Sequence, residues 1–475
     1  MEEIYTECDL CWLWLGESTK GTGTQNAIRV LKDWASDRHL FINANFNATY
    51  IKLTSELTSR PWFSCIWTVQ ESIFPKKLTV RCGAHTCFWD VFAEAAKNLE
   101  KHLTTCCISH NNTAHPYMSD IIEFVQAVST VDRYRKLMLD MRLKRDMELK
   151  RDVKLNLDIL TCLNLYRNRD SAKAKDKIFG LLSLIAEKDR GLVEVDYRRA
   201  TKDTYTELCE QYIRKTGSLE ILKYVLGNAK SSRVRPALPS WVPDWTLKIA
   251  EPTWQQGLLD RYSFYKSCGS LGSEPNFIKT CNKYILRECG VRCGIVANVG
   301  IERGAPYPKD GKVQQDMSER IPRGWSDSGL VDLNREGREK RRSEFWSTIL
   351  MDSVEGSDGI LRRAEEADYV EYQQVLEHVI TGSAWPAGTN RIYYSLETAT
   401  LFRKFFITED GHFGLGPVTM EKNDEIFVLR GGRCPLVLRS VNNNYKLIGD
   451  CFLYNFMDGE AMEDSESRSI IVSLE

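Results

Sequence analysis

The stretch DLCWLWL, residues 9–15, constrains the fold of this chain more than any other. Side chains in a β-strand alternate between two faces, and here both faces are apolar, with Trp12 and Trp14 on one and Leu13 and Leu15 on the other. A strand of this kind is typical of the centre of a parallel sheet that is buried on both sides. The stretch therefore predicts a buried, central strand.

A glycine turn and an amphipathic helix follow this strand. After Gly16 the sequence TQNAIRVLKDWASD has apolar residues at helical spacing, which predicts a helix over residues 24–36. Strand, turn and helix form an α/β unit, whose ligands gather at the carboxyl ends of its strands. A second helix is expected over residues 62–72, and KKLTVRCG after it predicts a short strand. Two or three strands with one face short of cover would leave an apolar surface patch, which monomers seldom tolerate.

Beyond this unit the chain changes from helical to β character. Apolar residues recur at helical spacing from about residue 90 to 225, and the charged run over residues 141–170 predicts one long helix with a solvated face. Residues 235–246 are proline-rich and are expected to be extended or turning. The polar residues 300–345 predict a surface loop. From about residue 390 to 460, short β-runs separated by Asp-Gly, Gly-Gly and Asn turns predict a β-meander or small barrel.

The expected fold class is α+β overall, with an incomplete N-terminal α/β sheet, a central α-helical region and a C-terminal antiparallel β unit. A chain of 475 residues is too long for a single core. The predicted domains, in chain order, are residues 1–75 (partial α/β sheet), 76–250 (helical), 251–390 (mixed, with the loop) and 391–475 (β unit).

The composition excludes several classes of protein. Basic and acidic residues balance at 64 against 65, so the chain lacks the basic excess that nucleic-acid binding normally requires. The N-terminus MEEIYTECDL lacks the basic start of a secretory signal, and the apolar runs fall short of the ~20 residues that span a bilayer. The 15 cysteines have no regular spacing, which is typical of a reduced intracellular protein. We expect a cytoplasmic protein with neither a nucleic-acid nor a membrane partner.

Several segments, in chain order, resemble fungal heterokaryon incompatibility (HET) domain proteins. MEEIYTECDLCWLWLGE is similar to one motif of that family, and RPWFSCIWTVQE to its signature, with Cys65 where the family usually has arginine. AKDKIFGLLSL, VDYRRATKDTYTEL, LPSWVPDW and the β-rich tail also resemble family segments. The family's opening segments ALSYVWG and WIDAICINQ have no counterpart here. Residues 1–75 are therefore expected to correspond to the C-terminal half of a HET domain.

This resemblance implies a candidate ligand site. HET domains are similar to Toll/interleukin-receptor (TIR) domains, some of which cleave NAD through a glutamate four residues after a tryptophan. Glu71 follows Trp67 by four residues here, and residues i and i+4 share one face of a helix. The resemblance implies Glu71 as the catalytic carboxylate, which would stabilise positive charge on the ribose as the nicotinamide bond breaks. The ligand-binding residues that it implies are Trp67, Ser64, Arg60 and Glu17.

The same residues have structural interpretations. The signature could be an aromatic core helix whose Glu71 either pairs with Arg60 or reaches solvent at the rim of a shallow cleft, because a buried unpaired charge is costly. Glu17 could be an acid at a helix start, favoured by the helix dipole. The aromatic side chains expected mainly in this core are Trp62, Phe63 and Trp67.

Other motifs predict structure rather than chemistry. Cys8 and Cys11 form a C-x-x-C, but residues three apart on a strand point to opposite faces, so no metal site is expected. GLGP, residues 414–417, precedes a β-run and predicts a turn rather than a phosphate site. Trp241 and Trp245 are expected to lock an extended segment across the helical region.

Functions from two classes remain open. The first is recognition: a non-self recognition protein of an incompatibility system, with protein partners, no cofactor, and homo-oligomerisation left open. The second is an NAD-cleaving hydrolase, with NAD as its substrate. A truncated, non-functional remnant is a further alternative that the sequence leaves open.

Overall fold

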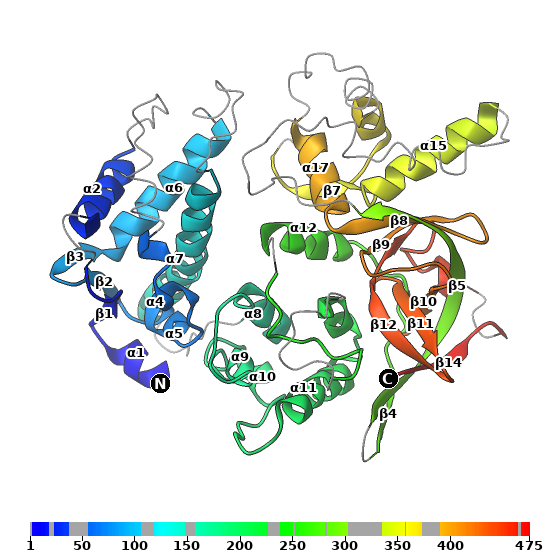
Figure 1. Ribbon diagram of the computed structural model, residues 1–475, viewed down its shortest axis with the longest axis horizontal. Helices are drawn as coiled ribbons and strands as arrows, with labels where there is room; N and C mark the ends of the chain where they lie inside the picture. Colours follow the sequence, from blue (N-terminus) through cyan, green and yellow to red (C-terminus); the bar gives the residue numbers. More distant parts are fainter. Residues whose placement is uncertain are drawn as a thin grey trace. The chain divides into compact units, whose positions relative to one another are not determined.

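A computed structural model describes residues 2–18, 23–37, 56–105, 118–147, 157–226, 238–249, 252–280, 283–302, 335–356, 358–372, 390–463 and 467–475. The chain folds into two compact units, which divide between Gly191 and Leu192 (Figure 1). This division falls inside the region that the sequence predicts as one helical domain. Each unit is mixed α/β in content, and the larger sheet belongs to the second unit.

The first unit contains a sheet of three strands, β1 (Leu10–Trp14), β2 (Lys77–Cys82) and β3 (His85–Phe88), in the order β1-β2-β3. β1 and β2 run parallel, whereas β3 pairs antiparallel with β2. The predicted strands are confirmed. The prediction that the first of them is central is wrong, because β1 pairs only with β2 among the described residues and lies at the edge.

One face of this sheet packs on helices and the other is open. Leu13 and Leu15 of β1 are buried in one core with residues of α2 (Gly23–Ala35), α6 (Trp89–Thr105) and α7 (Met118–Met147). The apolar side chains on the opposite face are partly exposed: Leu10 43 %, Trp12 50 %, Trp14 48 % and Phe88 69 %. The prediction of burial on both sides is therefore wrong for β1. The apolar surface patch expected of an incompletely covered sheet is confirmed.

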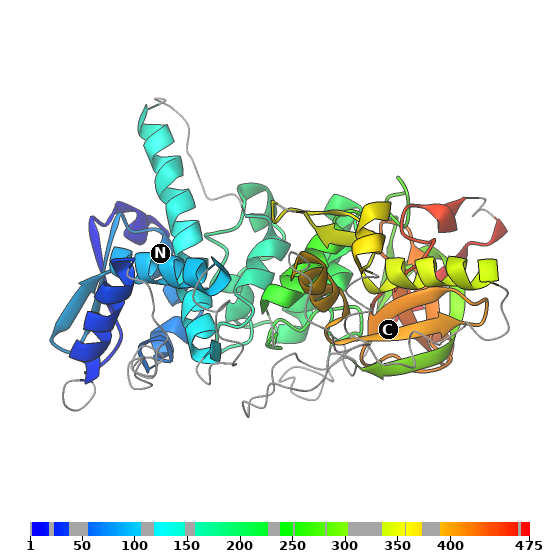
Figure 2. The same ribbon diagram turned by 90° about the horizontal axis from the view of Figure 1, so that it is seen from above.

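The remaining helices of this unit are short. They are α1 (Glu2–Glu7), α4 (Pro61–Ser64), α5 (Thr68–Ile73), α8 (Ile159–Leu165), α9 (Asp176–Phe179) and α10 (Glu187–Arg190). The predicted single helix over residues 141–170 is wrong, because α8 begins anew at Ile159, where the Asp158 side chain accepts the N–H of Thr161 at 2.9 Å. Figure 2 shows the end of α7 projecting past the other helices of this unit.

The second unit combines helices with a large sheet. Its helices are α11 (Thr201–Thr216), η1 (Glu220–Tyr224), α12 (Pro252–Tyr262), α15 (Arg335–Ile349), α17 (Asn390–Thr400) and η3 (Glu460–Met462). Of the predicted loop over residues 300–345, residues 303–334 lie outside the described ranges, and residues 335–345 belong to α15, whose buried face contains Phe345, Trp346 and Ile349. The charged first half of α15 conceals that pattern. α17 likewise replaces β structure at the start of the predicted β unit.

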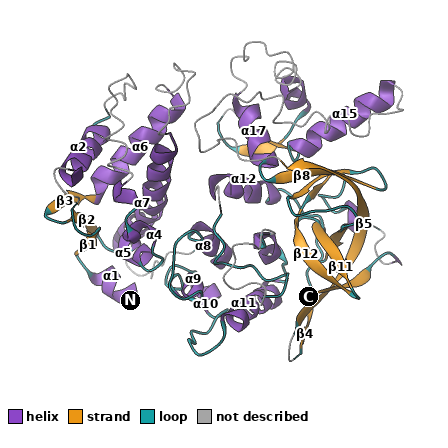
Figure 3. Cartoon of the chain, in the orientation of Figure 1, coloured by secondary structure: helices purple, strands orange, loops and turns teal. Residues whose placement is uncertain are grey.

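The strands of this unit are β4 (Asn276–Lys279), β5 (Tyr284–Glu302), β6 (Ser353–Glu355), β7 (Leu361–Arg363), β8 (Arg403–Thr408), β9 (Phe413–Pro417), β10 (Glu425–Leu429), β11 (Leu436–Val441), β12 (Asn444–Asp450), β13 (Phe452–Leu453) and β14 (Ile470–Leu474). β10, β11, β12, β14 and β5 pair in sequence, and a further β10–β5 pairing closes them into a ring (Figure 3). The predicted barrel is therefore present. It recruits β5 from well outside the predicted range.

Turn chemistry in this sheet follows the sequence in most places. Gly411, Gly431 and Asn442 adopt positive φ, as their turns predict. The glycines of GLGP are an exception, because they lie in strand β9 rather than a turn. Residues 238–246 contain neither helix nor strand, and the buried Trp241 donates its indole N–H to the carbonyl of Tyr284 at 3.4 Å.

The described cysteines are all free thiols. Of the helices in the described ranges, none combines the length and apolar character needed to cross a membrane.

Candidate functional site in the signature segment

The signature forms two short helices instead of the predicted continuous helix over residues 62–72. α4 begins at Pro61, which suits the first helical position, and ends at the extended residue Cys65. The interruption between α4 and α5 is stabilised by backbone hydrogen bonds to Asp170. The N–H of Ile66 donates to the carbonyl of Asp170 at 2.9 Å, and the N–H of Asp170 donates to the carbonyl of Ser64. The interruption therefore depends on a contact with residues about a hundred positions later in the chain.

The carboxylate of Glu71 is held at both oxygens by neutral donors. The Tyr5 hydroxyl donates to Oε1 at 3.2 Å, and the Trp62 indole N–H donates to Oε2 at 3.3 Å. The alternative in which Glu71 pairs with Arg60 does not hold among the described residues, since the Arg60 guanidinium lies 3.5 Å from the Leu15 carbonyl instead. Glu71 is half-buried. The two donors therefore fix the orientation of the carboxylate, and no cationic side chain in the described part of the chain bonds to it.

The surroundings of Glu71 keep neighbouring groups uncharged. Burial, followed by the charge and hydrogen bond of Glu71, raises the pKa of Tyr5 to about 12, so the phenol remains a donor at neutral pH. Burial also raises the pKa of Cys11 to about 11, with smaller contributions from Cys8 and Glu71. The Cys11 thiol is therefore a poor nucleophile and a poor metal ligand. In the described ranges, no group of three or more His, Cys, Asp or Glu side chains is placed to hold a metal ion.

Trp67 and Glu71 form hydrogen bonds with different partners and not with each other. Trp67 is the residue before α5, and its indole N–H donates to Asp176 at 3.4 Å. The indole that meets Glu71 belongs to Trp62, nine residues earlier. Trp62 and Phe63 are buried in the core as predicted, whereas Trp67 is only half-buried. An aromatic side chain therefore lies beside the Glu71 carboxylate, but it is that of Trp62 and not that of Trp67, which the i, i+4 spacing predicts.

The hydrogen bonds of the other candidate residues, Ser64, Glu17 and Arg60, go to groups other than the Glu71 carboxylate. The Ser64 hydroxyl donates to the carbonyl of Pro61 at 3.1 Å, within its own helix. Glu17 is exposed just after the end of β1, and its backbone carbonyl accepts a bond from the Cys82 thiol at 3.6 Å. Arg60 lies beside the end of the same strand.

A second segment, residues 164–180, packs on the signature and completes the site. The Gln70 amide donates to the carbonyl of Gly180 at 2.8 Å, and Arg169 donates to the carbonyl of Trp62 at 3.3 Å. Gly180 has no room for a side chain, because a Cβ there would lie 2.8 Å from the Asp176 carbonyl oxygen. The segments RPWFSCIWTVQE and AKDKIFGLLSL, far apart in sequence, thus form one structural unit.

Sequence reasoning missed two positioning residues. Tyr5 lies in the opening motif, but its role depends on the α1–α5 contact, which no periodicity reveals. Arg135 of α7 is buried and donates to the carbonyls of Ser72 and Lys76, at 3.3 and 2.7 Å, and so fixes the end of α5.

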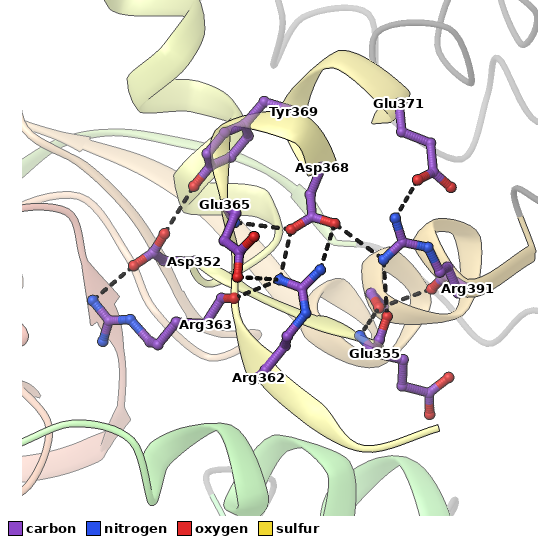
Figure 4. A network of polar contacts seen from close by, with 10 residues as sticks. Asp352, Glu355, Arg362, Arg363, Glu365, Asp368, Tyr369, Glu371 and Arg391 are labelled. Carbon is purple, nitrogen blue, oxygen red and sulfur yellow. Dashed lines mark hydrogen bonds and ion pairs between the residues drawn. The ribbon is translucent and has the colours of Figure 1, made fainter. Parts of the chain in front are cut away.

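The second unit contains a separate polar network, shown in Figure 4. The buried carboxylate of Asp368 accepts both guanidinium nitrogens of Arg362, at 2.8 and 3.0 Å, and one of Arg391 at 3.0 Å. It also accepts the N–H of Glu365, the residue before the helical residues 366–372, which is one of the two bonds of a capping box. The network joins the β6–β7 hairpin to α17, and its satisfied bonds indicate a structural role.

Arg363 extends this network toward the barrel. It pairs with Asp352 at 2.7 Å and with Asp458 at 2.8 Å. Burial raises the pKa of Asp352, although bonds from the Tyr369 hydroxyl and Arg363 oppose that rise. The contacts tie the hairpin to the segment that follows β13.

Comparison with known families gives one match near the start of the chain and one near its end. Residues 1–71 match the family described as heterokaryon incompatibility protein (HET), and residues 339–472 match the Het-6 β-barrel domain. The chain therefore carries a HET match and a Het-6 barrel match. The HET match ends at Glu71, so the carboxylate held by Tyr5 and Trp62 lies entirely within it. The Het-6 barrel match includes the Asp368 network, whereas β5, which closes the ring, precedes it.

The chain is also similar to a curated protein, "Heterokaryon incompatibility protein 6, OR allele" of Neurospora crassa, with 25 % identity over 346 residues. The alignment covers 62 % of this chain and 49 % of the relative, so the chain spans about half the length of that protein. No solved structure matches.

Proposed function

We propose that this chain acts in fungal non-self recognition and promotes an incompatibility response, with growth arrest or cell death, through its HET segment, residues 1–71. The observation that supports this is the occurrence of a HET match and a Het-6 barrel match in one chain that is also similar to a heterokaryon incompatibility protein. The partners would be proteins of the same incompatibility system, met in the cytoplasm after two hyphae fuse.

A genetic test follows from this proposal. The coding sequence would be introduced into a fungal strain that lacks it, and that strain would be fused with a panel of natural isolates. We expect poor heterokaryon growth with some isolates and normal growth with others. Equal growth with every isolate, with and without the sequence, would overturn the proposal.

The geometry of Glu71 favours a second candidate, NAD cleavage. A carboxylate that is oriented by Tyr5 and Trp62 and lacks a bonded cation in the described residues keeps its charge available to a developing positive ribose. Both oxygens already accept one hydrogen bond, which favours an electrostatic role over a covalent one.

Glu71→Gln separates this candidate from simple recognition. Glutamine keeps the shape, and its amide oxygen and nitrogen can still bond Trp62 and the Tyr5 hydroxyl, so folding should be retained. Purified protein would be incubated with NAD and the nicotinamide released would be measured. The matched control is Glu123→Gln, an exposed glutamate on α7. Equal release by wild type and Glu71→Gln, or none by wild type, would remove the catalytic role and leave recognition.

A further inference from the structure

Arg169 carries a charge that the described part of the chain does not neutralise. Burial lowers its pKa to about 10, so the guanidinium stays protonated at neutral pH. The bond that its side chain forms is a single one, to the Trp62 carbonyl at 3.3 Å, and no carboxylate in the described ranges bonds to it. A desolvated cation without an opposite charge is costly.

The Trp62 carbonyl does not need the bond from Arg169. It also accepts the Thr68 hydroxyl at 2.7 Å, which is the shorter and better bond. Arg135, in the same unit, shows how this chain satisfies an arginine with a structural role: it donates to backbone carbonyls of the segment that ends α5, at 3.3 and 2.7 Å. Arg169 therefore has donors to spare that the backbone around it does not use.

A second polar group beside Arg169 also lacks a partner. The Tyr166 carbonyl accepts the N–H of Arg169 at 3.0 Å. The Tyr166 side chain is 1 % exposed, and its hydroxyl bonds to none of the described residues. Of the ionisable groups in those residues, the Tyr166 phenol has the strongest electrostatic effect on Arg169, so the two side chains are neighbours. Burial raises the pKa of Tyr166 well above its usual value, so the hydroxyl remains a donor.

These two donors lie beside the interruption between α4 and α5. Asp170, the residue after Arg169, bonds through its backbone to Ser64 and Ile66, which places Arg169 next to Cys65. Arg169, Ser64 and Cys65 are each half-buried, so a ligand can reach the guanidinium from the surface. A guanidinium and a phenol offer only donors and positive charge, so the complementary group is an anion that accepts several hydrogen bonds. A phosphate group presents more acceptor oxygens than a carboxylate and fits a guanidinium fork equally well.

We propose that Arg169 and Tyr166 bind the phosphate group of a ligand, which accepts the free guanidinium N–H groups and the phenolic O–H. Trp62 links this site to the candidate carboxylate, because its carbonyl bonds Arg169 and its indole N–H bonds Glu71. A nucleotide that is held by its phosphate at Arg169 would place its ribose near the same tryptophan as Glu71. This last step rests on NAD cleavage, the second candidate function, whereas the phosphate site stands without it.

The test is calorimetric titration of the full chain with inorganic phosphate, pyrophosphate and ADP-ribose, at constant ionic strength. We expect saturable binding, and none with acetate or adenosine. Tighter binding of ADP-ribose than of pyrophosphate would identify the ligand as a nucleotide, and the reverse would identify it as the free anion. Arg169→Met should raise the dissociation constant by about tenfold or more, and Tyr166→Phe by about threefold to tenfold, because each removes donors to an anion.

Two controls make these results specific. Arg198→Met removes an arginine whose side chain is 93 % exposed, and it should bind phosphate as wild type does. Glu71→Gln should also bind inorganic phosphate as wild type does, so a failure of the catalytic assignment is distinguishable from a failure of this site.

The stability of the variants separates binding from a structural role. Because the Arg169 charge and the Tyr166 hydroxyl are unsatisfied by the described residues, Arg169→Met and Tyr166→Phe should unfold in phosphate-free buffer at the urea concentration of wild type or above it. The proposal is overturned by a wild type that does not bind phosphate, by acetate binding as tightly as phosphate, or by unchanged binding in either variant. A clear loss of stability in Arg169→Met would make Arg169 a structural residue and would overturn it as well.

Discussion

Replacing Asp368 with asparagine tests whether the polar network of Figure 4 stabilises the second unit. The carboxylate is 1 % exposed and accepts four hydrogen bonds, three of them from Arg362 and Arg391. In Asp368→Asn the amide N–H groups would meet guanidinium donors, and two cations would lose their shared anion. Removing one partner of a buried pair costs about 3 to 5 kcal/mol, and the lower value applies here because both arginines are partly exposed.

The assay is urea unfolding followed by tryptophan emission, since Trp346 packs on Tyr372 in the same unit. A loss of about 3 kcal/mol corresponds to a fall of about 1 M in the urea midpoint. The matched control is Glu366→Gln, an exposed glutamate two residues away. If Asp368→Asn unfolds at the same urea concentration as this control, the network does not stabilise the unit.

The difference in unfolding free energy between wild type and Asp368→Asn should depend on pH, with a defined sign. Burial alone would raise the pKa of Asp368, but hydrogen bonds from Arg362, the Glu365 N–H and Arg391 outweigh it and lower the pKa. A carboxylate with a lowered pKa stabilises the fold above its unfolded value of about 4, and this stabilisation is lost as the pH falls through the folded pKa. The difference in unfolding free energy between wild type and Asp368→Asn should therefore become smaller below about pH 4. A gap that widens in acid would contradict the assignment.

Three further predictions concern the first unit. Gly180→Ala should lower the free energy of unfolding by about 1 to 3 kcal/mol in urea titrations, because its Cβ would collide with the Asp176 carbonyl; an unchanged midpoint would contradict the close contact. Tyr5→Phe should cost about 1 to 2 kcal/mol in the same assay, since Glu71 loses a donor, and a stabilised variant would refute that bond. Cys11, with its pKa raised to about 11 from 9.0, should alkylate at pH 8 about a hundredfold more slowly than a thiol of ordinary pKa. Mass spectrometry that finds comparable rates would show the thiol to be less buried.

Local patterns predict those elements whose stability is local. The helix expected over residues 24–36 is α2, and the β-runs with Asp-Gly and Gly-Gly turns are β8 to β12, because periodicity and positive-φ residues act within a few positions. The edge position of β1 was not accessible in this way. An alternation of large apolar residues is equally consistent with a covered sheet and with one that leaves Trp12 and Trp14 partly exposed.

Local sequence patterns also fail to predict which residues surround Glu71 in the candidate site. The sequence singles out Glu71, but its partners Tyr5 and Trp62 come from contacts that no helical spacing encodes. The break that separates Trp67 from Glu71 depends on Asp170, in a segment far along the chain. Tertiary contacts therefore decide the chemistry of the signature.

If the HET segment promotes an incompatibility response as proposed, and if Glu71 is its catalytic carboxylate, the response depends on the charge of Glu71. The most direct test of this dependence is viability in a fungal host with inducible expression, comparing wild type, Glu71→Gln and Glu123→Gln at matched protein abundance. We expect growth arrest and staining of dying cells with wild type and Glu123→Gln, and survival with Glu71→Gln. Equal survival of all three strains would contradict the proposed response, and equal death with Glu71→Gln would contradict the role of the Glu71 charge and leave recognition.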